Sequence, residues 1–317
     1  MALLPLLSLR STTALYGKST EESSPSEVSG RADQNSFIIL DTSDGSLITV
    51  PDREFLYGAL SYEMSPGFES EALKAQAVAC YTYFSRLRKI HRLSPDPELK
   101  GADFSADLSC GQFYLSDSQL KKKWGSLYEK SIRKIRSACD SVYGQVLTDG
   151  SGELIDAAYH AVSSGATENA ADVFGIDNPH LKSAASPGDV YAPDQITDVS
   201  FTADEFRDRL KKADSSIRFS GKPENYIKST ECTDAGTVKK LVVCSSSFTG
   251  GQIRTAFELR SAAFTVEYAD GFFTFTVRGW GHGVGMSQYG AQSMAQDGAD
   301  YREILMHYYT DICIRKI

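Results

Sequence analysis

The sequence lacks an excess of basic residues and an apolar run of the roughly 20 residues that a membrane-spanning helix needs. It carries 33 Lys and Arg against 41 Asp and Glu, a formal net charge of −8. Because phosphate groups attract basic surfaces, we expect no nucleic-acid partner. The opening MALLPLLSL has a short apolar stretch with no basic residue before it, which makes it a weak signal or anchor segment. An extracytoplasmic location and an N-terminal membrane attachment both stay open.

Closely spaced cysteines are also absent. The six cysteines lie far apart and form no C-x-x-C pair, which argues against a zinc ribbon or a thioredoxin-type centre. A chain of 317 residues that is 41% hydrophobic buries a sizeable core and needs no disulfide framework. We therefore expect buried or free thiols at Cys80, Cys110, Cys139, Cys232, Cys244 and Cys313.

The composition changes along the chain and indicates its organisation. Residues 18–36 are polar, rich in serine and without periodicity, so residues 1–36 are expected to form an N-terminal stub and a disordered tether. The folded domain is expected over residues 37–317. Within it, residues 195–260 are expected to form an inserted second lobe beside a substrate cleft.

Apolar residues repeat at helical spacing in the first half of the folded part, and short strand-like runs follow. These patterns predict an α+β fold, in which N-terminal helices pack on a mixed, mostly antiparallel sheet and a smaller α/β lobe flanks the cleft. Helices are expected over 51–64, 69–90, 117–139 and 203–212, and strands over 144–148 and 154–161.

The segment FTVEYADGFFTFTV predicts a β-hairpin. Apolar and polar residues alternate on both sides of Asp270-Gly271, a favoured two-residue turn. Pairing outward from this turn puts every apolar residue on one face, so the register is well specified. The expected pairs are Tyr268 with Phe273, Val266 with Phe275, and Phe264 with Val277.

Glu63, in the stretch SYEMSP, is the first candidate for chemistry. It follows Leu56 and Leu60 at helical spacing, so its carboxyl group lies on the apolar stripe at the end of a helix. Desolvation there is expected to raise its pKa, as a general acid requires. The alternative is a structural glutamate that reaches solvent or pairs with a lysine.

The second candidate is AAYHAVSSGATENAADVFG, residues 157–175. A strand ends near His160 and runs into small polar residues that could place hydroxyl and N–H groups against a polar ligand. No G-x-S-x-G elbow is present, so a serine hydrolase of that type is not supported. A turn with a satisfied histidine is the alternative.

The third candidate is RGWGHGVGMSQYGAQ, residues 278–292. Its glycines alternate with large residues, which suits a backbone that approaches another chain or a ligand closely. The run lacks the spacing of dinucleotide and phosphate-binding loops. His282 has no companion at metal-ligand spacing, so a metal role is disfavoured.

Together these stretches resemble the stage II sporulation protein D family, which includes the amidase-enhancer proteins. The segments that carry the resemblance occur in the family's order and cover most of residues 50–316. They are FLYGALSYEMSPGFESEALKAQAVACYTYFSRLR, AAYHAVSSGATENAADVFG and RGWGHGVGMSQYGAQSMAQDGADYREILMHYYTDICI.

The resemblance implies a peptidoglycan lytic transglycosylase that acts on glycan strands stripped of their stem peptides and leaves 1,6-anhydro ends. In this family the glutamate of the E-M motif is the catalytic acid/base, which is Glu63 here. We expect no cofactor. The other two segments are expected to contribute substrate-binding residues, namely His160, Ser163, Ser164, Thr167, Arg278, His282, Gln288 and Tyr289.

The resemblance further implies peptidoglycan glycan strands and a cell-wall amidase as partners. It implies an extracytoplasmic location at the cell wall or membrane, which in a sporulating cell is the septal or forespore-engulfing membrane. The alternative within the family is a non-catalytic peptidoglycan-binding protein that enhances an amidase.

Two departures from the family matter. An arginine common after the catalytic glutamate is replaced by Tyr81, and Arg254, Arg260 or Arg278 are candidates to hold the muramic lactyl carboxylate instead. Some members bind zinc through a Cys/His cluster, but the corresponding stretch LKGADFSADLSCGQFY offers Cys110 alone, so no metal is expected.

Overall fold

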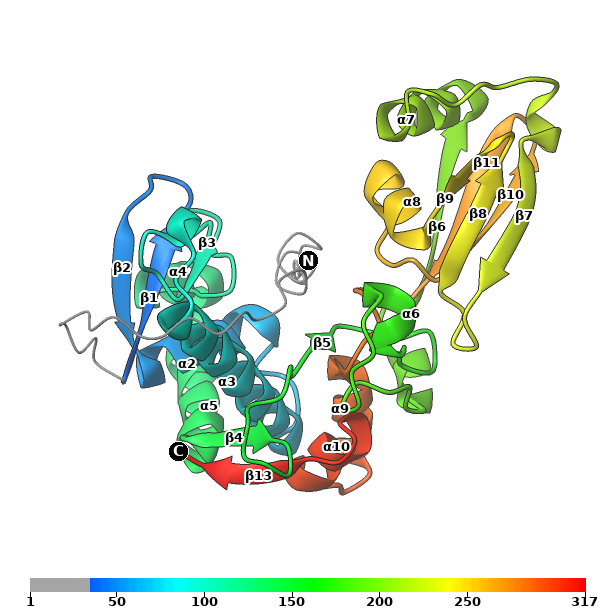
Figure 1. The fold of residues 1–317 in the computed structure, drawn as a ribbon. Coiled ribbons are helices and arrows are strands. Elements are labelled where there is room, and N and C mark those ends of the chain that lie inside the picture. Colours follow the sequence, from blue (N-terminus) through cyan, green and yellow to red (C-terminus); the bar gives the residue numbers. More distant parts are fainter. Residues whose placement is uncertain (1–34) are drawn as a thin grey trace. The chain divides into compact units, whose positions relative to one another are not determined.

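The computed structural model describes residues 35–317, which form two compact units. The first unit comprises residues 35–157, 298–306 and 311–317, and the second comprises residues 158–297 and 307–310. Helices and small, mostly antiparallel sheets occur in both, which confirms the predicted α+β class (Figure 1). The predicted stub and tether lie outside the described residues, apart from their last two positions.

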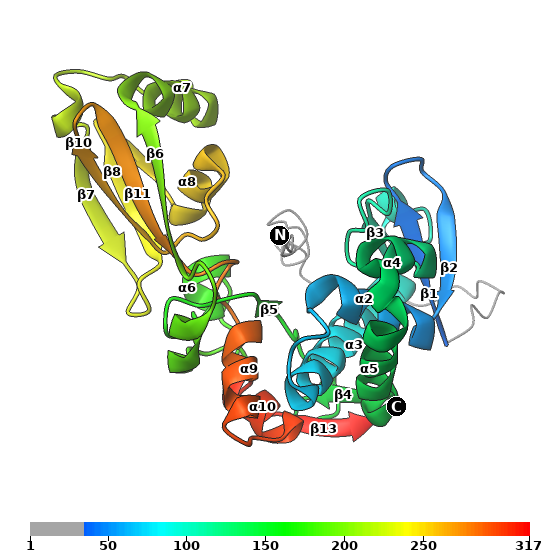
Figure 2. The same ribbon diagram turned by 180° about the vertical axis from the view of Figure 1, so that it is seen from behind.

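Three long helices lie against one another in the first unit (Figures 1 and 2). Two of them, α2 (Asp52–Glu63) and α3 (Ser70–Leu93), confirm the helices expected from the apolar stripes. The single helix expected over 117–139 is wrong in one respect, because Gly125 adopts φ 51° and ψ −123° and interrupts it. The observed elements are α4 (Asp117–Trp124), the 3-10 turn η2 (Gly125–Leu127) and α5 (Tyr128–Val142).

Two small sheets complete the first unit. One has the order β2-β1-β3, in which β1 pairs antiparallel with β2 and parallel with β3, and the other joins β4 to β13. The aromatic core of the first unit contains the rings of Phe37, Phe55, Phe84 and Phe104. The rings of Phe55 and Phe84 are centred 4.9 Å apart. The elements are β1 (Ser36–Asp41), β2 (Leu47–Pro51), η1 (Pro97–Leu99), β3 (Phe104–Ala106), β4 (Gln145–Thr148) and β13 (Cys313–Lys316), with most of α10 (Tyr301–Tyr308).

Residues 196–277 form a sheet-and-helix lobe within the second unit. Two three-stranded sheets, β10-β11-β6 and β7-β8-β9, share a core with α7 and α8, which lie on one side of the strands (Figure 1). Phe206, Phe273 and Phe275 are fully buried in this core. The elements are β6 (Ile196–Thr202), α7 (Ala203–Ala213), η4 (Pro223–Asn225), β7 (Ile227–Cys232), β8 (Val238–Val243), β9 (Ser246–Phe248), α8 (Gly250–Phe257), β10 (Phe264–Ala269) and β11 (Phe272–Arg278).

The predicted hairpin is confirmed in every pair. Tyr268 lies opposite Phe273, Val266 opposite Phe275, and Phe264 opposite Val277. Asp270 and Gly271 have φ values of 52° and 89°, the left-handed region that a two-residue hairpin turn requires. The strand β11 therefore delivers the chain to the glycine-rich run in a fixed direction.

The rest of the second unit is built from short elements. The strand expected over 154–161 is observed only as β5 (Tyr159–His160), which pairs parallel with β12 (Met286–Ser287). Short helical segments flank this pair: α6 (Ala170–Phe174), η3 (Pro187–Tyr191) and α9 (Gln288–Gln296). All six cysteines are free thiols, as expected. Over residues 35–317, no helix combines the length and apolar character of a membrane span.

Candidate functional site

Glu63 is the last residue of α2 and lies on its buried face. The residue is 2% exposed, and Leu56 and Leu60 on the same stripe are 1% and 0% exposed, so the predicted apolar stripe is confirmed. One structural alternative required the Glu63 side chain to reach solvent, and its low exposure argues against that alternative. A carboxylate at the C-terminal end of a helix faces the negative end of the helix dipole, which makes a nearby cation favourable.

Lys123 of α4 supplies that cation. Its ammonium group donates a hydrogen bond to the carbonyl oxygen of Ser61 at 2.9 Å, near the end of α2, and interacts electrostatically with Glu63. Burial lowers the pKa of Lys123, and the nearby Glu63 opposes this shift. No sequence pattern singles out Lys123, because nothing in the run KKKW distinguishes the lysine that turns toward α2. Pairing with a lysine is also what the structural alternative for Glu63 predicts.

Tyr81 lies at the opposite end of α2 from Glu63. Its hydroxyl donates to the buried carboxylate of Asp52 at 2.7 Å, and Arg88 donates to the same carboxylate at 2.8 Å. Asp52 begins the helix that Glu63 ends, which separates the two by about 16 Å along the axis at 1.5 Å per residue. The guanidinium group in contact with this cluster is that of Arg88, whereas Arg254, Arg260 and Arg278 belong to the second unit.

The second and third candidate segments lie side by side in the second unit. Beyond the β5–β12 pair, the backbones of Val162 and Trp280 exchange hydrogen bonds of 3.1 and 2.7 Å, and Glu168 N–H donates to Gly283 at 2.7 Å. Two stretches more than a hundred residues apart therefore form one structural element.

The glycines of the third segment serve this backbone contact. Gly279, Gly281, Gly283 and Gly285 all have positive φ, between 73° and 117°. A Cβ atom on Gly279 would lie 2.6 Å from the carbonyl oxygen of Val162. The backbone that approaches these glycines is that of the second segment of the same chain.

Two histidines meet in this element. The rings of His160 and His282 are centred 5.7 Å apart. His160 Nδ1 lies 3.1 Å from the carbonyl oxygen of Val284 and is its donor, while His282 Nδ1 accepts the Val284 N–H at 3.0 Å. Burial lowers the pKa of both rings, and for His282 well below the usual value of 6.5. Both histidines are therefore neutral near neutral pH.

Buried carboxylates, which the sequence did not single out, organise the hydroxyl groups of the second segment. Asp189 accepts hydrogen bonds from the backbone N–H and hydroxyl of Ser163 and, at 2.6 Å, from Ser287. Glu168 accepts from Thr233 at 2.8 Å and from the N–H of Thr237 at 3.2 Å. Only a fold that brings distant segments together reveals these partners.

The remaining residues of the second segment are also engaged within the protein. The hydroxyl of Ser164 donates to the carbonyl oxygen of Ala235 at 2.5 Å, and Thr167, fully buried, accepts the N–H of Ala184 at 2.8 Å. These contacts place the two hydroxyl groups in the framework of the loop, and their contact with substrate stays a prediction.

Exposure separates the residues expected from the third segment. Gln288 is buried, His282 and Tyr289 are partly exposed, and Arg278 is exposed. Burial raises the pKa of the Tyr289 hydroxyl, which therefore remains a neutral donor. Together with the partly exposed Ser164 of the second segment, Arg278, His282 and Tyr289 are the members of the predicted set that present surface to a ligand.

No cluster of three or more His, Cys, Asp or Glu side chains suited to a metal ion occurs within residues 35–317. Cys110 is exposed, and its thiol lies 3.3 Å from the carbonyl oxygen of Asp107. The expectation of a metal-free protein stays a prediction.

Comparison with known proteins identifies the relatives of this chain. The family model described as stage II sporulation protein matches residues 43–148. The stage II sporulation protein D of Bacillus amyloliquefaciens is 36% identical over 86% of this chain and 76% of its own length. That of Bacillus subtilis (strain 168) is 35% identical over 92% of this chain and 82% of its own length. The amidase enhancer of Bacillus subtilis is 25% identical over 80% of this chain, which spans 39% of that relative.

Proposed function

The chain belongs to the stage II sporulation protein D family, and from this premise we propose that it is a peptidoglycan lytic transglycosylase with Glu63 as its catalytic acid/base. Its substrate is the glycan strand from which stem peptides have been removed. It cleaves the bond between N-acetylmuramic acid and N-acetylglucosamine and leaves a 1,6-anhydro end. The observation that carries the proposal is the burial of Glu63 at the end of an apolar helix stripe, within the segment that the family model matches.

One carboxyl group suffices for this reaction. Protonated Glu63 gives its proton to the glycosidic oxygen as the bond from that oxygen to the anomeric carbon breaks. The carboxylate then takes the proton of the muramic C6 hydroxyl, whose oxygen bonds to the anomeric carbon. Glu63 ends protonated, as it began. Because no water is activated, the second carboxylate of a glycoside hydrolase is not needed.

The surroundings of Glu63 support both halves of this cycle. Low exposure excludes water and favours the neutral acid that the first step requires. Lys123 favours the carboxylate that exists between the two steps. The two influences oppose each other, as a group that gives and regains a proton requires.

The second unit contributes substrate contacts in this proposal. His160, Ser163, Ser164, Thr167 and Gln288 order the loops, and Arg278, His282 and Tyr289 present side chains to the sugar. Neutral histidines suit this task, because they donate and accept hydrogen bonds without repelling cationic neighbours.

The alternative is a non-catalytic protein that binds peptidoglycan and enhances a cell-wall amidase. The similarity to an amidase enhancer favours it, as does Tyr81 at the position of the family arginine. In either role the protein takes part in the cell-wall remodelling of sporulation, with glycan strands and an amidase as partners, outside the cytoplasm at the wall or membrane. Incubation with denuded glycan strands separates the two, since only the enzyme generates anhydro-ended products in the absence of an amidase.

A further inference from the structure

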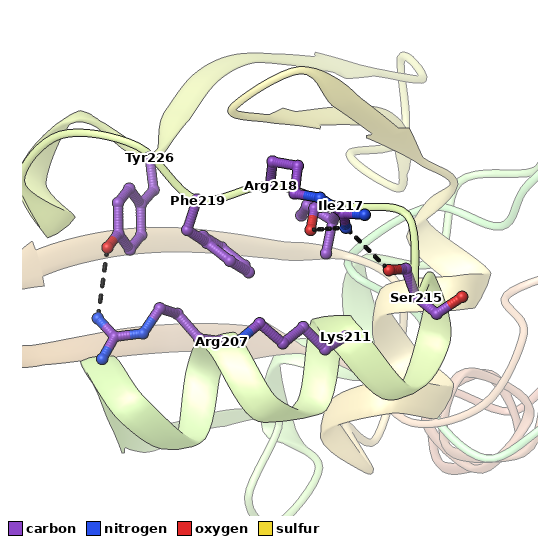
Figure 3. Close-up of a pocket in the computed structure, with 7 residues that line it drawn as sticks. All are labelled: Arg207, Lys211, Ser215, Ile217, Arg218, Phe219 and Tyr226. Atoms are coloured by element: carbon purple, nitrogen blue, oxygen red, sulfur yellow. Dashed lines mark hydrogen bonds between the residues drawn. The ribbon is translucent and has the colours of Figure 1, made fainter.

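The lobe formed by residues 196–277 contains a cavity of about 680 Å³ that no part of the proposed reaction uses. It lies between α7 and the segment that follows this helix, with Tyr226 at one end (Figure 3). None of its lining residues belongs to the three segments that resemble the family. The lining residues are Arg207, Lys211, Ser215, Ile217, Arg218, Phe219 and Tyr226.

The lining is basic in a protein that is acidic as a whole. Three of the seven residues are cationic and none is acidic, while the chain has a net charge of −8. An anionic polymer is repelled by most of such a surface, so a local cationic cavity decides where it binds. Arg207 and Lys211 lie one turn apart on α7 and therefore project from the same face of the helix.

The three cations are engaged to different degrees. Arg207 forms an ion pair with Asp204 and donates to the Tyr226 hydroxyl at 3.3 Å. Arg218 turns back onto its own loop and donates to three carbonyl groups, those of Ser215, Ser216 and Ile217 at 2.9–3.1 Å. Within the part of the chain that the structure describes, Lys211 has neither a hydrogen bond nor an ion pair. Its ammonium group is the one with its donors available to a ligand.

An aromatic wall accompanies these charges. Phe219 is partly exposed and points toward the helix that carries Arg207 and Lys211 (Figure 3). Its ring is centred 5.0 Å from that of Tyr226, which stacks in turn on the core residue Phe273 at 6.1 Å. Core packing therefore holds the wall in place, and a ligand meets a preformed surface.

We propose that this cavity binds a carboxylated sugar residue of the glycan strand, with the carboxylate on Lys211 and an apolar sugar face on Phe219. The muramic residue of a denuded strand carries such a carboxylate on its lactyl group, so the ligand identity rests on the proposed function. The partly exposed aromatic ring beside the cations favours a sugar over an acidic protein segment, for which cations alone suffice. The cavity is thus a second glycan-binding site, on a different unit from Glu63.

Binding of denuded strands to the full-length Glu63→Gln protein tests this site without cleavage. Lys211→Gln is expected to weaken binding about fivefold, the upper value for one exposed ion pair, and Lys211→Glu to weaken it further. The matched control is Lys212→Gln, the next residue of the same helix, which is also exposed and basic but does not line the cavity. It is expected to bind like the parent protein.

The second arm of the binding experiment changes the glycan strand and keeps the proteins unchanged. Reducing the lactyl carboxylates of the strands to alcohols is expected to weaken binding of the parent protein and to remove the difference between it and Lys211→Gln. Equal affinity of the Lys211 and Lys212 variants for native strands overturns the inference, and so does a Lys211 effect that persists on reduced strands. The latter result would mean that Lys211 binds an uncharged group of the strand, and a Lys211 effect confined to an acidic protein ligand would assign the cavity to that class of partner. The proposed function is tested separately, by cleavage and not by binding. It is contradicted if the Glu63→Gln protein still cleaves the strands.

Discussion

A Cβ atom added to Gly285 would stand 1.9 Å from the carbonyl oxygen of Ala158. The segments that precede and follow the inserted lobe are thus in close backbone contact, which leaves no room for a side chain at position 285. Real Cβ atoms do not approach oxygen this closely, so a side chain requires the two backbones to separate.

Gly285→Ala is therefore expected to destabilise the protein by more than the usual strain of a left-handed residue, which is about 1–2 kcal/mol. Gly175→Ala is the matched control, because its φ of 74° equals that of Gly285 within a degree but nothing lies within 4 Å of its Cβ position. Urea denaturation measures the free energy of unfolding of both variants, and the difference between their losses is the contribution of the steric clash. Equal losses of stability in the two variants would show that the backbone moves away from the new Cβ atom, built 1.9 Å from the Ala158 oxygen, without an energetic cost.

The paired histidines predict a loss of stability at acidic pH. Burial holds the pKa of His160 and His282 below 6.5 in the folded protein, while the unfolded chain protonates near that value. As the pH falls below about 6.5, the unfolded state binds protons that the folded state does not, so the free energy of unfolding decreases by up to about 1.4 kcal/mol per pH unit for each histidine. Denaturation midpoints between pH 7 and pH 5 measure this slope.

His160→Gln is expected to reduce the slope, since one titrating group is removed from the linkage. His307→Gln is the control, because His307 is exposed, donates a hydrogen bond to the carbonyl oxygen of Ala185 and contacts the ring of Tyr308 edge-on. An unchanged slope in His160→Gln would mean that other groups cause the acid lability.

Asp189 is expected to be essential for the stability of the second unit. Asp189→Asn replaces an acceptor oxygen by a donor facing Ser163 and Ser287, at a fully buried site. A loss of about 2–4 kcal/mol follows from one unsatisfied buried group within a hydrogen-bonded network. Asp177→Asn, at an exposed ion pair with Lys182, is expected to cost less than about 1 kcal/mol. Comparable thermal stability of both variants would contradict this role.

Tyr81→Phe separates structure from catalysis at the position of the family arginine. Loss of the hydroxyl leaves Asp52 with Arg88 as its side-chain donor and is expected to cost about 1–2 kcal/mol of stability. Cleavage of denuded strands is expected to continue at the parental rate, because Tyr81 contacts the start of α2 and Glu63 forms its end. A folded Tyr81→Phe protein without activity would place this position in the reaction instead.

The sequence predicted best what local patterns decide. The hairpin around Asp270-Gly271 was predicted pair by pair, because strict alternation and a two-residue turn leave one register. The helix that ends at Glu63 was predicted from its apolar stripe. In contrast, the break at Gly125 was missed, since a single glycine within a helical pattern does not by itself end a helix.

Long-range partners could not be predicted. Asp189 and Glu168 resemble ordinary surface carboxylates in the sequence, and only the fold brings hydroxyl groups from distant segments to them. Lys123 is one of three consecutive lysines, and only the packing of α4 against α2 shows which of them reaches Ser61. The basic cavity likewise combines a helix, the loop that follows it and Tyr226, the residue before β7.

Incubation of denuded glycan strands with the full-length protein and its Glu63→Gln variant, followed by mass spectrometry of the products, tests the proposed function most directly. The parent protein is expected to release fragments with 1,6-anhydro-muramic ends, and Glu63→Gln to bind the strands without cleaving them. Glu54→Gln, an exposed glutamate on the same helix, is expected to cleave like the parent protein. Anhydro-ended fragments from Glu63→Gln, or none from the parent protein, would contradict the assignment.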